Sequence, residues 1–204
     1  MPESVKIQVL NKAKKAKRGA IYFADSFKQV ANAKAVNKTL ERLTKAGELH
    51  RIATGIYVRP VEDDVIGTVM PGIDEVARAI ARRDKAHIVP TGSYALYKLG
   101  LTTQVPLNAV YYTNASPRKV RIGRQTITFK RASAKNVAAV GEISKLAIQA
   151  LRTIGKDNLT EDELEKIKTA LKKEKPQHLA HDLQLAPEWI RKLLTPPKTT
   201  LADA

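Results

Sequence analysis

The chain has 204 residues, enough for one or two domains, and 43% of them are hydrophobic, so it can bury a sizeable core. Lysine and arginine total 36 against 20 aspartate and glutamate, a net charge of +16 that favours a polyanionic partner. The absence of cysteine excludes disulfide frameworks, cysteine zinc sites, iron–sulfur clusters and thiol catalysis, and is compatible with a cytoplasmic location.

The positive charge is concentrated in the N-terminal part of the chain. Residues 1–60 carry 13 lysines and arginines against 4 acids, a net charge of +9, whereas residues 61–204 carry 23 against 16. No apolar run is long enough for a membrane span and no signal-peptide pattern is recognised, so we expect no membrane partner. The distribution predicts a basic N-terminal module that binds a polyanion, with charge for solubility alone as the alternative.

The first predicted elements are two helices with a strand between them. The pattern indicates, in chain order, a helix at 4–17, a strand at 20–23 and a short helix at 27–30. Ser4 is the expected N-cap of the first helix, because its hydroxyl can accept a hydrogen bond from a backbone N–H of the first turn. Either Asp25 or Ser26 is expected to cap the second helix in the same way.

A third helix is predicted at 33–46, and its two faces differ in chemistry. With about 100° per residue, Leu40 and Leu43 lie within about 40° of Val36 and form one apolar stripe. Three lysines lie on the opposite edge, about 160–200° from Val36. These lysines and their polar neighbours are Lys34, Lys38 and Lys45, flanked by Asn37 and Arg42. A helix that buries one edge and presents long polar side chains on the other is typical of DNA recognition.

The segment after Gly47 predicts a β-hairpin, with strands at 48–52 and 56–59 around a turn that ends in Gly55. Three helices, an intervening strand and a terminal hairpin follow the order of a winged helix-turn-helix, which we predict for residues 1–60. The wing would place Arg51 and Arg59 beside the duplex. The alternative is a small helical hairpin whose lysines are only solvated.

A linker is predicted at 61–72, where acidic residues gather ahead of a Pro-Gly pair. The region after it predicts helices at 74–83 and 94–99, an extended piece at 87–90, and strands at 107–113, 119–122 and 125–130. Basic residues with no acid between them cluster on the last two strands: Arg118, Lys119, Arg121, Arg124, Lys130, Arg131 and Lys135. Three interpretations stay open for this set, namely a second polyanion surface, a face for an acidic protein, and a solvated sheet.

The last third of the chain is predicted to be helical, since apolar residues from Ile143 to Ile154 recur at helical spacing and Thr160 with Glu163 form a capping box. Short helices are expected at 179–185 and 187–194, and a flexible tail at 196–204. The predicted fold class is therefore α+β. It comprises a winged helix-turn-helix at 1–60, a linker at 61–72, and a mixed α/β domain with a helical C-terminal part at 73–195.

The sequence shows no clear pattern for catalysis. His178 and His181 supply half of a metal site and have no third ligand, so a surface or capping role is expected. Gly92 and Ser93 resemble the Gly-Ser pair of nucleotidyltransferases, but the nearby strand lacks the Asp-x-Asp pair that would hold Mg²⁺. Ser93 is therefore expected to cap a helix. We predict that the protein is not an enzyme and has no metal, no cofactor and no catalytic residue.

The whole pattern resembles the AbiEi family of antitoxins from type IV toxin–antitoxin systems, which act in abortive infection. The resemblance rests on LTKAGELHRIATGIYVRP at the end of the predicted winged helix, on PTGSYALYKLGLTTQVP, and on AVYYTNASPRKVRIGRQTITFKR. Together these stretches cover roughly residues 5–135, and the helical remainder is compatible with the family.

The resemblance implies a two-part role in the cytoplasm. The winged helix would bind inverted repeats in its own promoter and repress transcription, and the other domain would counter a nucleotidyltransferase-like toxin without a stable complex being required. The family supplies no catalytic residue. Its DNA-contacting helix and wing correspond here to Lys34, Asn37, Lys38, Arg42, Lys45, Arg51 and Arg59.

Two other functions stay open at the level of sequence. One is a stand-alone DNA-binding regulator of transcription that has no toxin partner. The other is an RNA-binding protein or an RNA-modifying enzyme that uses the basic residues from Arg118 to Lys135.

Overall fold

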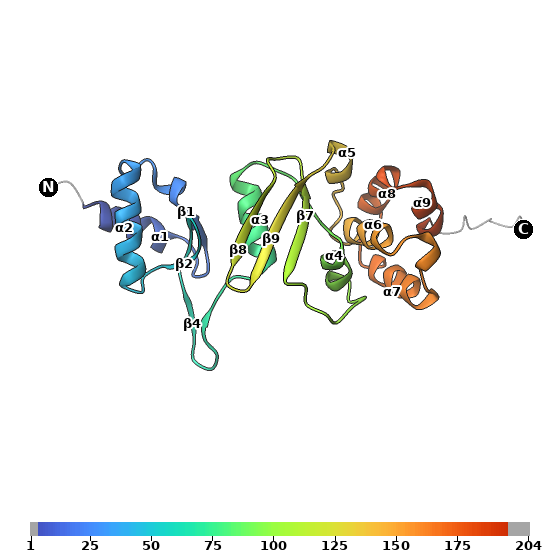
Figure 1. Ribbon diagram of the computed structural model, residues 1–204, viewed down its shortest axis with the longest axis horizontal. Helices are drawn as coiled ribbons and strands as arrows, with labels where there is room; N and C mark the ends of the chain where they lie inside the picture. Colours follow the sequence, from blue (N-terminus) through green and yellow to red (C-terminus); the bar gives the residue numbers. More distant parts are fainter. Residues whose placement is uncertain (1–3, 196–204) are drawn as a thin grey trace, which may run out of the picture. The chain divides into compact units, whose positions relative to one another are not determined.

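The computed structural model describes residues 4–195, and the flexible tail predicted at 196–204 lies outside the described residues. The protein is a mixed α and β structure, as predicted, with helices before and after its small sheets (Figure 1). Its residues form two compact units. Of the described residues, the first unit comprises 4–82 together with Val120–Arg124, and the second comprises Arg83–Lys119 together with 125–195.

The first unit begins with a helix, a short strand, a 3-10 helix and a second α-helix, followed by two hairpins and a third α-helix. These elements are α1 (Val5–Lys15), β1 (Ile21–Phe23), η1 (Ala24–Phe27), α2 (Ala33–Lys45), β2 (His50–Ala53), β3 (Ile56–Val58), β4 (Val61–Asp63), β5 (Gly67–Val69) and α3 (Ile73–Arg83). Strands β1, β3 and β2 form an antiparallel sheet in that order. Val58 at its centre lies opposite Ile21 on one side and His50 on the other.

Helix α2 has well-defined signals at both ends. The Asn32 side chain caps its start by accepting a backbone N–H three residues on, at 2.9 Å. At its end Gly47 adopts a φ of +74°, which favours glycine because it has no Cβ. The N–H groups of Gly47 and Glu48 then donate to the carbonyls of Thr44 and Leu43. This Schellman motif satisfies two carbonyls that a helix end leaves unpaired.

The short second helix differs from the one predicted at 27–30. It is a 3-10 helix over Ala24–Phe27, so Asp25 and Ser26 lie inside it instead of in front of it. The Ser26 hydroxyl accepts a hydrogen bond from the backbone N–H of Phe23, the residue before the helix, at 3.3 Å. Phe27 is fully buried. The packing of this ring places the turn earlier than the local pattern indicates.

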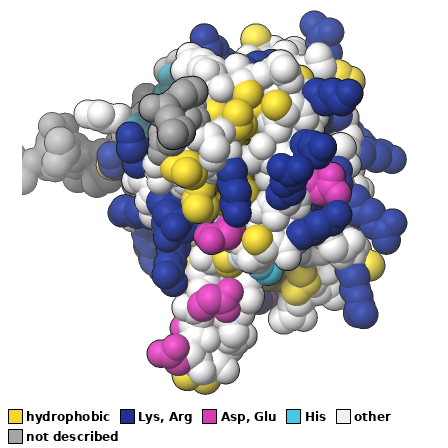
Figure 2. Space-filling model, turned by 90° about the vertical axis from the view of Figure 1, so that its left-hand side faces the viewer, with side chains coloured by type: hydrophobic (Ala, Val, Ile, Leu, Met, Phe, Trp, Pro, Cys, Tyr) yellow, Lys and Arg dark blue, Asp and Glu magenta, His cyan; other side chains and the backbone are white. Residues whose placement is uncertain are grey.

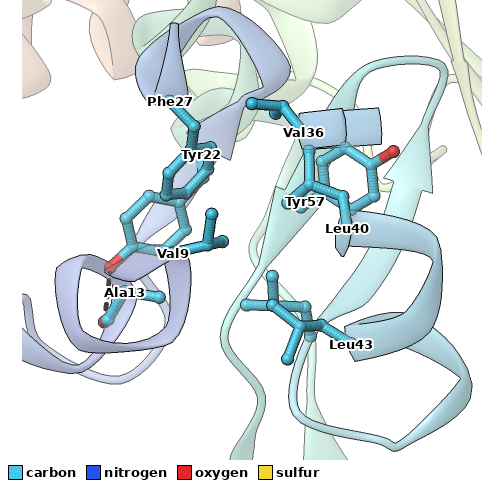
Figure 3. Packing of buried hydrophobic residues seen from close by; sticks show 9 residues of the cluster. Val9, Ala13, Tyr22, Phe27, Val36, Leu40, Leu43 and Tyr57 are labelled. Atoms are coloured by element: carbon cyan, nitrogen blue, oxygen red, sulfur yellow. Dashed lines mark hydrogen bonds between the residues drawn. The ribbon is translucent and has the colours of Figure 1, made fainter. Parts of the chain in front are cut away.

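A hydrophobic cluster holds α1, α2 and the sheet together, as Figure 3 shows. Val36, Leu40 and Leu43 on α2 are 2%, 0% and 0% exposed, which confirms the predicted apolar stripe. They point toward side chains of α1 and β1 on the other side of the cluster. The Tyr22 hydroxyl donates to the carbonyl of Ala13 at 2.8 Å and so joins β1 to α1.

The segment predicted as a linker at 61–72 contains a β-hairpin. Strands β4 and β5 pair antiparallel and project from the first unit at the bottom of Figure 1. Asp63 builds the turn, because its Oδ1 accepts the N–H groups of Val65 and Ile66 at 2.9 and 3.1 Å. The acids of this segment predicted a solvated linker, but one of them closes a turn. The first unit continues beyond the hairpin into α3.

A four-stranded sheet and a run of helices follow in the chain. Their elements are β6 (Ile88–Thr91), α4 (Ser93–Lys98), β7 (Asn108–Thr113), β8 (Arg118–Ile122), β9 (Gln125–Arg131), α5 (Ala134–Val137), α6 (Glu142–Ile154), η2 (Lys156–Asn158), α7 (Glu161–Leu171), α8 (Pro176–Leu185) and α9 (Glu188–Leu194). The strand order is β6, β7, β9, β8, with β6 antiparallel and β9 parallel to β7. The capping box predicted for Thr160 and Glu163 is present at the start of α7.

Two buried carboxylates hold the start of α6 to the helices that follow it. Asp182 on α8 is 0% exposed and accepts the N–H groups of Val140 and Gly141 at 2.8 and 2.9 Å. The Ser144 hydroxyl donates to the same carboxylate at 2.5 Å. Glu174 accepts the N–H of Ser144 at 3.1 Å and that of the preceding residue at 2.7 Å. The unpaired N–H groups of the first turn are thus satisfied by negative charge, which also complements the helix dipole.

The pKa values of both carboxyls reflect this arrangement. Burial raises the pKa of Asp182, but the hydrogen bonds from Ser144, His181 and the backbone outweigh it, so the pKa lies below its usual value. Burial likewise raises the pKa of Glu174, and backbone N–H donors with the nearby His178 lower it by more. Both groups are therefore ionised at neutral pH.

Replacement of Leu40 by alanine should destabilise the protein by about 2–5 kcal/mol, because the leucine is fully buried and its truncation leaves a cavity. Urea unfolding followed by circular dichroism gives the free energy of unfolding. The control is Lys38→Ala on the exposed edge of the same helix, which should change that energy by less than about 0.5 kcal/mol. Equal losses in the two variants would contradict the burial of this edge.

Replacement of Asp182 by asparagine should destabilise the protein by about 1–3 kcal/mol, because the amide leaves buried N–H donors unsatisfied. Since folding lowers the pKa of Asp182, its contribution is fully present above the unfolded pKa of about 3.9. It is lost as the pH falls through the folded pKa. The melting temperature should therefore fall more steeply on acidification for the wild type than for Asp182→Asn. The exposed Asp157→Asn is the control, and parallel curves for wild type and Asp182→Asn would refute the assignment.

Candidate nucleic-acid interface

The exposed edge of α2 carries most of the side chains predicted to reach DNA. Because Val36, Leu40 and Leu43 are buried, the opposite edge faces solvent. The polar side chains of this edge are all exposed: Lys34, Asn37, Lys38, Arg42 and Lys45. Their orientation is confirmed, and contact with DNA stays a prediction. Such side chains are suited to phosphates, and those of Asn and Arg also to base edges.

One carboxylate lies within this basic edge. Glu41 pairs with Lys45 one turn further on, with 2.9 Å between Oε1 and Nζ, and both side chains are largely exposed. The hydrogen bond from Lys45 and then its charge lower the pKa of Glu41. An exposed pair of this kind contributes little to stability. Its effect is to offset the charge of Lys45, so the positive charge of the edge centres on Lys34, Lys38 and Arg42.

The two arginines predicted for the wing have different surroundings. Arg51 lies on β2 and is exposed. Arg59 follows β3, is half-buried, and donates from Nη1 to the carbonyl of Lys14 at 3.3 Å. This carbonyl is one of those that α1 leaves without an intrahelical partner at its C-terminal end. Arg59 therefore caps the C-terminal end of α1, whereas the side chain of Arg51 on the hairpin is exposed to solvent.

Further basic side chains, which the site prediction omitted, belong to α1 and the residues after it. They are Lys14, Lys15, Lys17 and Arg18, all exposed, and the run KAKKAKR is the sequence signal for them. An open groove of about 780 Å³ beside α1 is lined by Gln8, Asn11, Lys12, Lys14, Lys15 and Val30. Figure 2, which views this side of the molecule, shows Lys and Arg side chains spread widely over its surface.

Packing contacts occupy one member of the second basic set, Arg118. Its side chain is partly buried, its guanidinium pairs with Asp84, and it lies 5.5 Å from the centre of the Phe129 ring. Burial lowers the pKa of Arg118, and the nearby charge of Arg83 lowers it further. The Arg118 side chain is therefore fixed by contacts within the protein and is less accessible to a partner. The other members proposed for this surface are exposed: Lys119, Arg121, Arg124, Lys130 and Arg131.

The residues considered for catalysis have structural contacts. Ser93 is the first residue of α4, and the N-cap is the preceding glycine, so the prediction of Ser93 as the cap is wrong. The glycine supplies a φ of +63°, which a serine side chain would disfavour. His178 and His181 contact Glu174 and Asp182 at 3.6 and 2.8 Å, the carboxylates that cap α6. Within residues 4–195 no group of three or more side chains could hold a metal, and no helix is long and apolar enough to cross a membrane.

The chain is similar to a protein family and to a solved structure. The family of unknown function DUF6088 matches residues 8–179, which is most of the chain. The crystal structure of the RV2827C protein from Mycobacterium tuberculosis is similar at a TM-score of 0.45 and 11% sequence identity, over 95% of this chain and 82% of that one. No curated protein matches the sequence.

Proposed function

We propose that this chain, which belongs to the DUF6088 family, binds duplex DNA through a winged helix-turn-helix in its first unit. Helix α2 is the recognition helix in this proposal, and the β2–β3 hairpin is the wing. The observation that carries the proposal is the burial of Val36, Leu40 and Leu43, which leaves the basic edge of α2 exposed.

The order of elements in the first unit supports this assignment. Helix α1, strand β1, the short helix η1, helix α2 and the strands β2 and β3 follow the order of helices and strands expected for a winged helix-turn-helix. The second helix of the motif is reduced to one 3-10 turn. Helix α2 has 13 residues, which is long enough to lie in a major groove about 12 Å wide and to reach past it.

The charges on α2 suit a helix that meets DNA at its N-terminal end. Its first turn contains no acid, so the positive end of the helix dipole is not neutralised there. Lys34, Asn37 and Lys38 lie in the first two turns, the part of a recognition helix that contacts base edges. Arg42 lies further along the same exposed edge and is suited to the phosphate backbone.

The biological role that we attach to this binding is twofold. We propose that the protein acts in the cytoplasm as a repressor of its own promoter. We also propose that it is an antitoxin, which counters a nucleotidyltransferase-like toxin without catalysing a reaction. The antitoxin part rests on the similarity to the AbiEi family. A stand-alone regulator of transcription uses the same first unit and differs in having no toxin partner.

Charge reversal of Lys34→Glu with Lys38→Glu should abolish binding to the protein's own upstream DNA, because it replaces attraction to phosphates by repulsion. Wild-type affinity should fall steeply with salt, and each phosphate contact made by a lysine should add about 0.9 to the slope of log K against log salt. Fluorescence anisotropy with labelled promoter duplex at several salt concentrations measures both quantities.

The matched control is Lys168→Glu with Lys172→Glu, two exposed lysines of the same spacing at the end of α7. It changes the net charge by the same amount and should leave affinity within a few-fold of the wild type. Unchanged binding by the α2 variant would contradict the proposal. So would tighter binding to structured RNA that Lys119→Ala with Arg121→Ala abolishes, since that outcome favours the second basic set.

The antitoxin role predicts a neighbouring gene for a nucleotidyltransferase-like protein whose expression arrests growth. Co-expression of the present chain should restore growth. The Lys34→Glu/Lys38→Glu variant should restore it as well, because the similarity to the AbiEi family implies that the toxin is countered by the domain that follows the winged helix. Colony counts under separate inducible promoters measure the effect, and failure of the wild type to restore growth would leave only the regulator.

A further inference from the structure

The β4–β5 hairpin ends in two large apolar side chains that face solvent. Val65 is 91% exposed and Ile66 is 73% exposed, the highest values among the large hydrophobic side chains of the described residues. Single exposed hydrophobic residues are ordinary, but an adjacent pair at the end of a projecting hairpin is a typical contact for another protein. Since both side chains are exposed, the hairpin of this chain does not insert into a groove of its own chain.

Hydrogen bonds within the hairpin hold its tip in place. The Asp63 carboxylate accepts the N–H groups of Val65 and Ile66, and the Thr68 hydroxyl donates to the Glu62 carboxylate at 3.0 Å. The tip therefore presents its apolar pair in a defined conformation before any partner arrives. A preorganised element loses less conformational entropy on binding than a flexible one.

Negative charge surrounds the apolar pair. Glu62, Asp63 and Asp64 are exposed next to the tip, and no lysine or arginine lies between Pro60 and Arg78. Figure 2 shows Asp and Glu side chains on the projection at the bottom, with hydrophobic side chains at its end. Three carboxylates disfavour contact with nucleic acid or with an anionic membrane, and they favour a partner that is basic and partly apolar.

The groove beside α1 has the complementary chemistry. Three lysines line it, together with two amide side chains and Val30. It is an open groove of about 780 Å³, so it can receive a projecting segment of another chain. Ile7 on the same helix is 47% exposed and adds apolar surface to α1.

We propose that the β4–β5 hairpin of one copy docks in the α1 groove of a second copy, so that the protein self-associates. The apolar pair would pack against Val30, and the carboxylates would pair with Lys14 and Lys15. A reciprocal exchange of two hairpins buries both tips and closes the assembly with two-fold symmetry. The groove is formed by α1 and Val30, so this contact leaves the exposed edge of α2 open and does not depend on DNA binding.

Self-association is measured without DNA, by analytical ultracentrifugation of the full chain over a range of micromolar concentrations. The wild type should be dimeric, and the dimer should weaken with salt because opposite charges face each other. Val65→Ser with Ile66→Ser should give a monomer. The matched control is Val105→Ser with Leu107→Ser, which removes two apolar side chains that are 56% and 68% exposed, and it should remain dimeric.

A charge-swap experiment tests the pairing itself. Glu62→Lys with Asp64→Lys puts positive charge on the hairpin, and Lys14→Glu with Lys15→Glu puts negative charge in the groove. Each variant alone should be a monomer, whereas an equal mixture of the two should form a heterodimer, since both of its contacts again join opposite charges. Circular dichroism checks that each variant is folded. A monomeric wild type, a dimeric Val65→Ser/Ile66→Ser variant, or a mixture that stays monomeric would overturn the proposal.

Discussion

The burial of Val36, Leu40 and Leu43 fixes the rotation of α2 about its own axis, and the charge distribution of the first unit depends on it. A helix turned by half a revolution would expose these side chains, at a cost of about 1.5–3 kcal/mol for each. It would also bury lysines, which are almost never buried without a partner. The cluster shared with α1 and the sheet thus decides which side of α2 a partner can reach.

Three carboxylates of this protein accept hydrogen bonds from backbone N–H groups. Asp63 closes an exposed turn, whereas Asp182 and Glu174 satisfy the first N–H groups of α6 from inside the helical part. In each case an oxygen accepts bonds that the chain cannot make with its own helix or strand. A serine, a histidine and an aspartate therefore meet at Ser144, His181 and Asp182 without forming a nucleophilic site, because the serine donates to the carboxylate and is buried.

Two elements of the first unit carry charge of one sign. Helix α1 has lysines and no acid, whereas the β4–β5 hairpin has Glu62, Asp63 and Asp64 and no lysine or arginine. The acids of the hairpin would be repelled by a phosphate backbone, and the groove proposed for the hairpin is lined by α1 and Val30, so a docked hairpin would leave the exposed edge of α2 open. The proposed recognition edge and the proposed docking groove thus lie on different helices of the same unit.

Local pattern determined much of the first unit and of its candidate site. The period of α2, its Asn32 cap and its stop at Gly47 depend on neighbouring residues, and so the helix and its exposed lysines could be predicted from the sequence. The same holds for the capping box of α7, whose two members are three residues apart.

Tertiary structure alone decided the features that join residues far apart in the chain. Arg59 donates to the carbonyl of Lys14, Arg118 pairs with Asp84, and Asp182 accepts N–H groups at the start of α6. Because the partners are far apart in the chain, neighbouring residues give no signal of these contacts. The 3-10 helix η1 is likewise placed by the burial of Phe27. The sequence thus determined which side chains α2 exposes, because helical period is a local property. Packing decided which other basic side chains remain exposed. A side chain such as that of Arg59 or Arg118 is held inward only by a partner that folding brings to it.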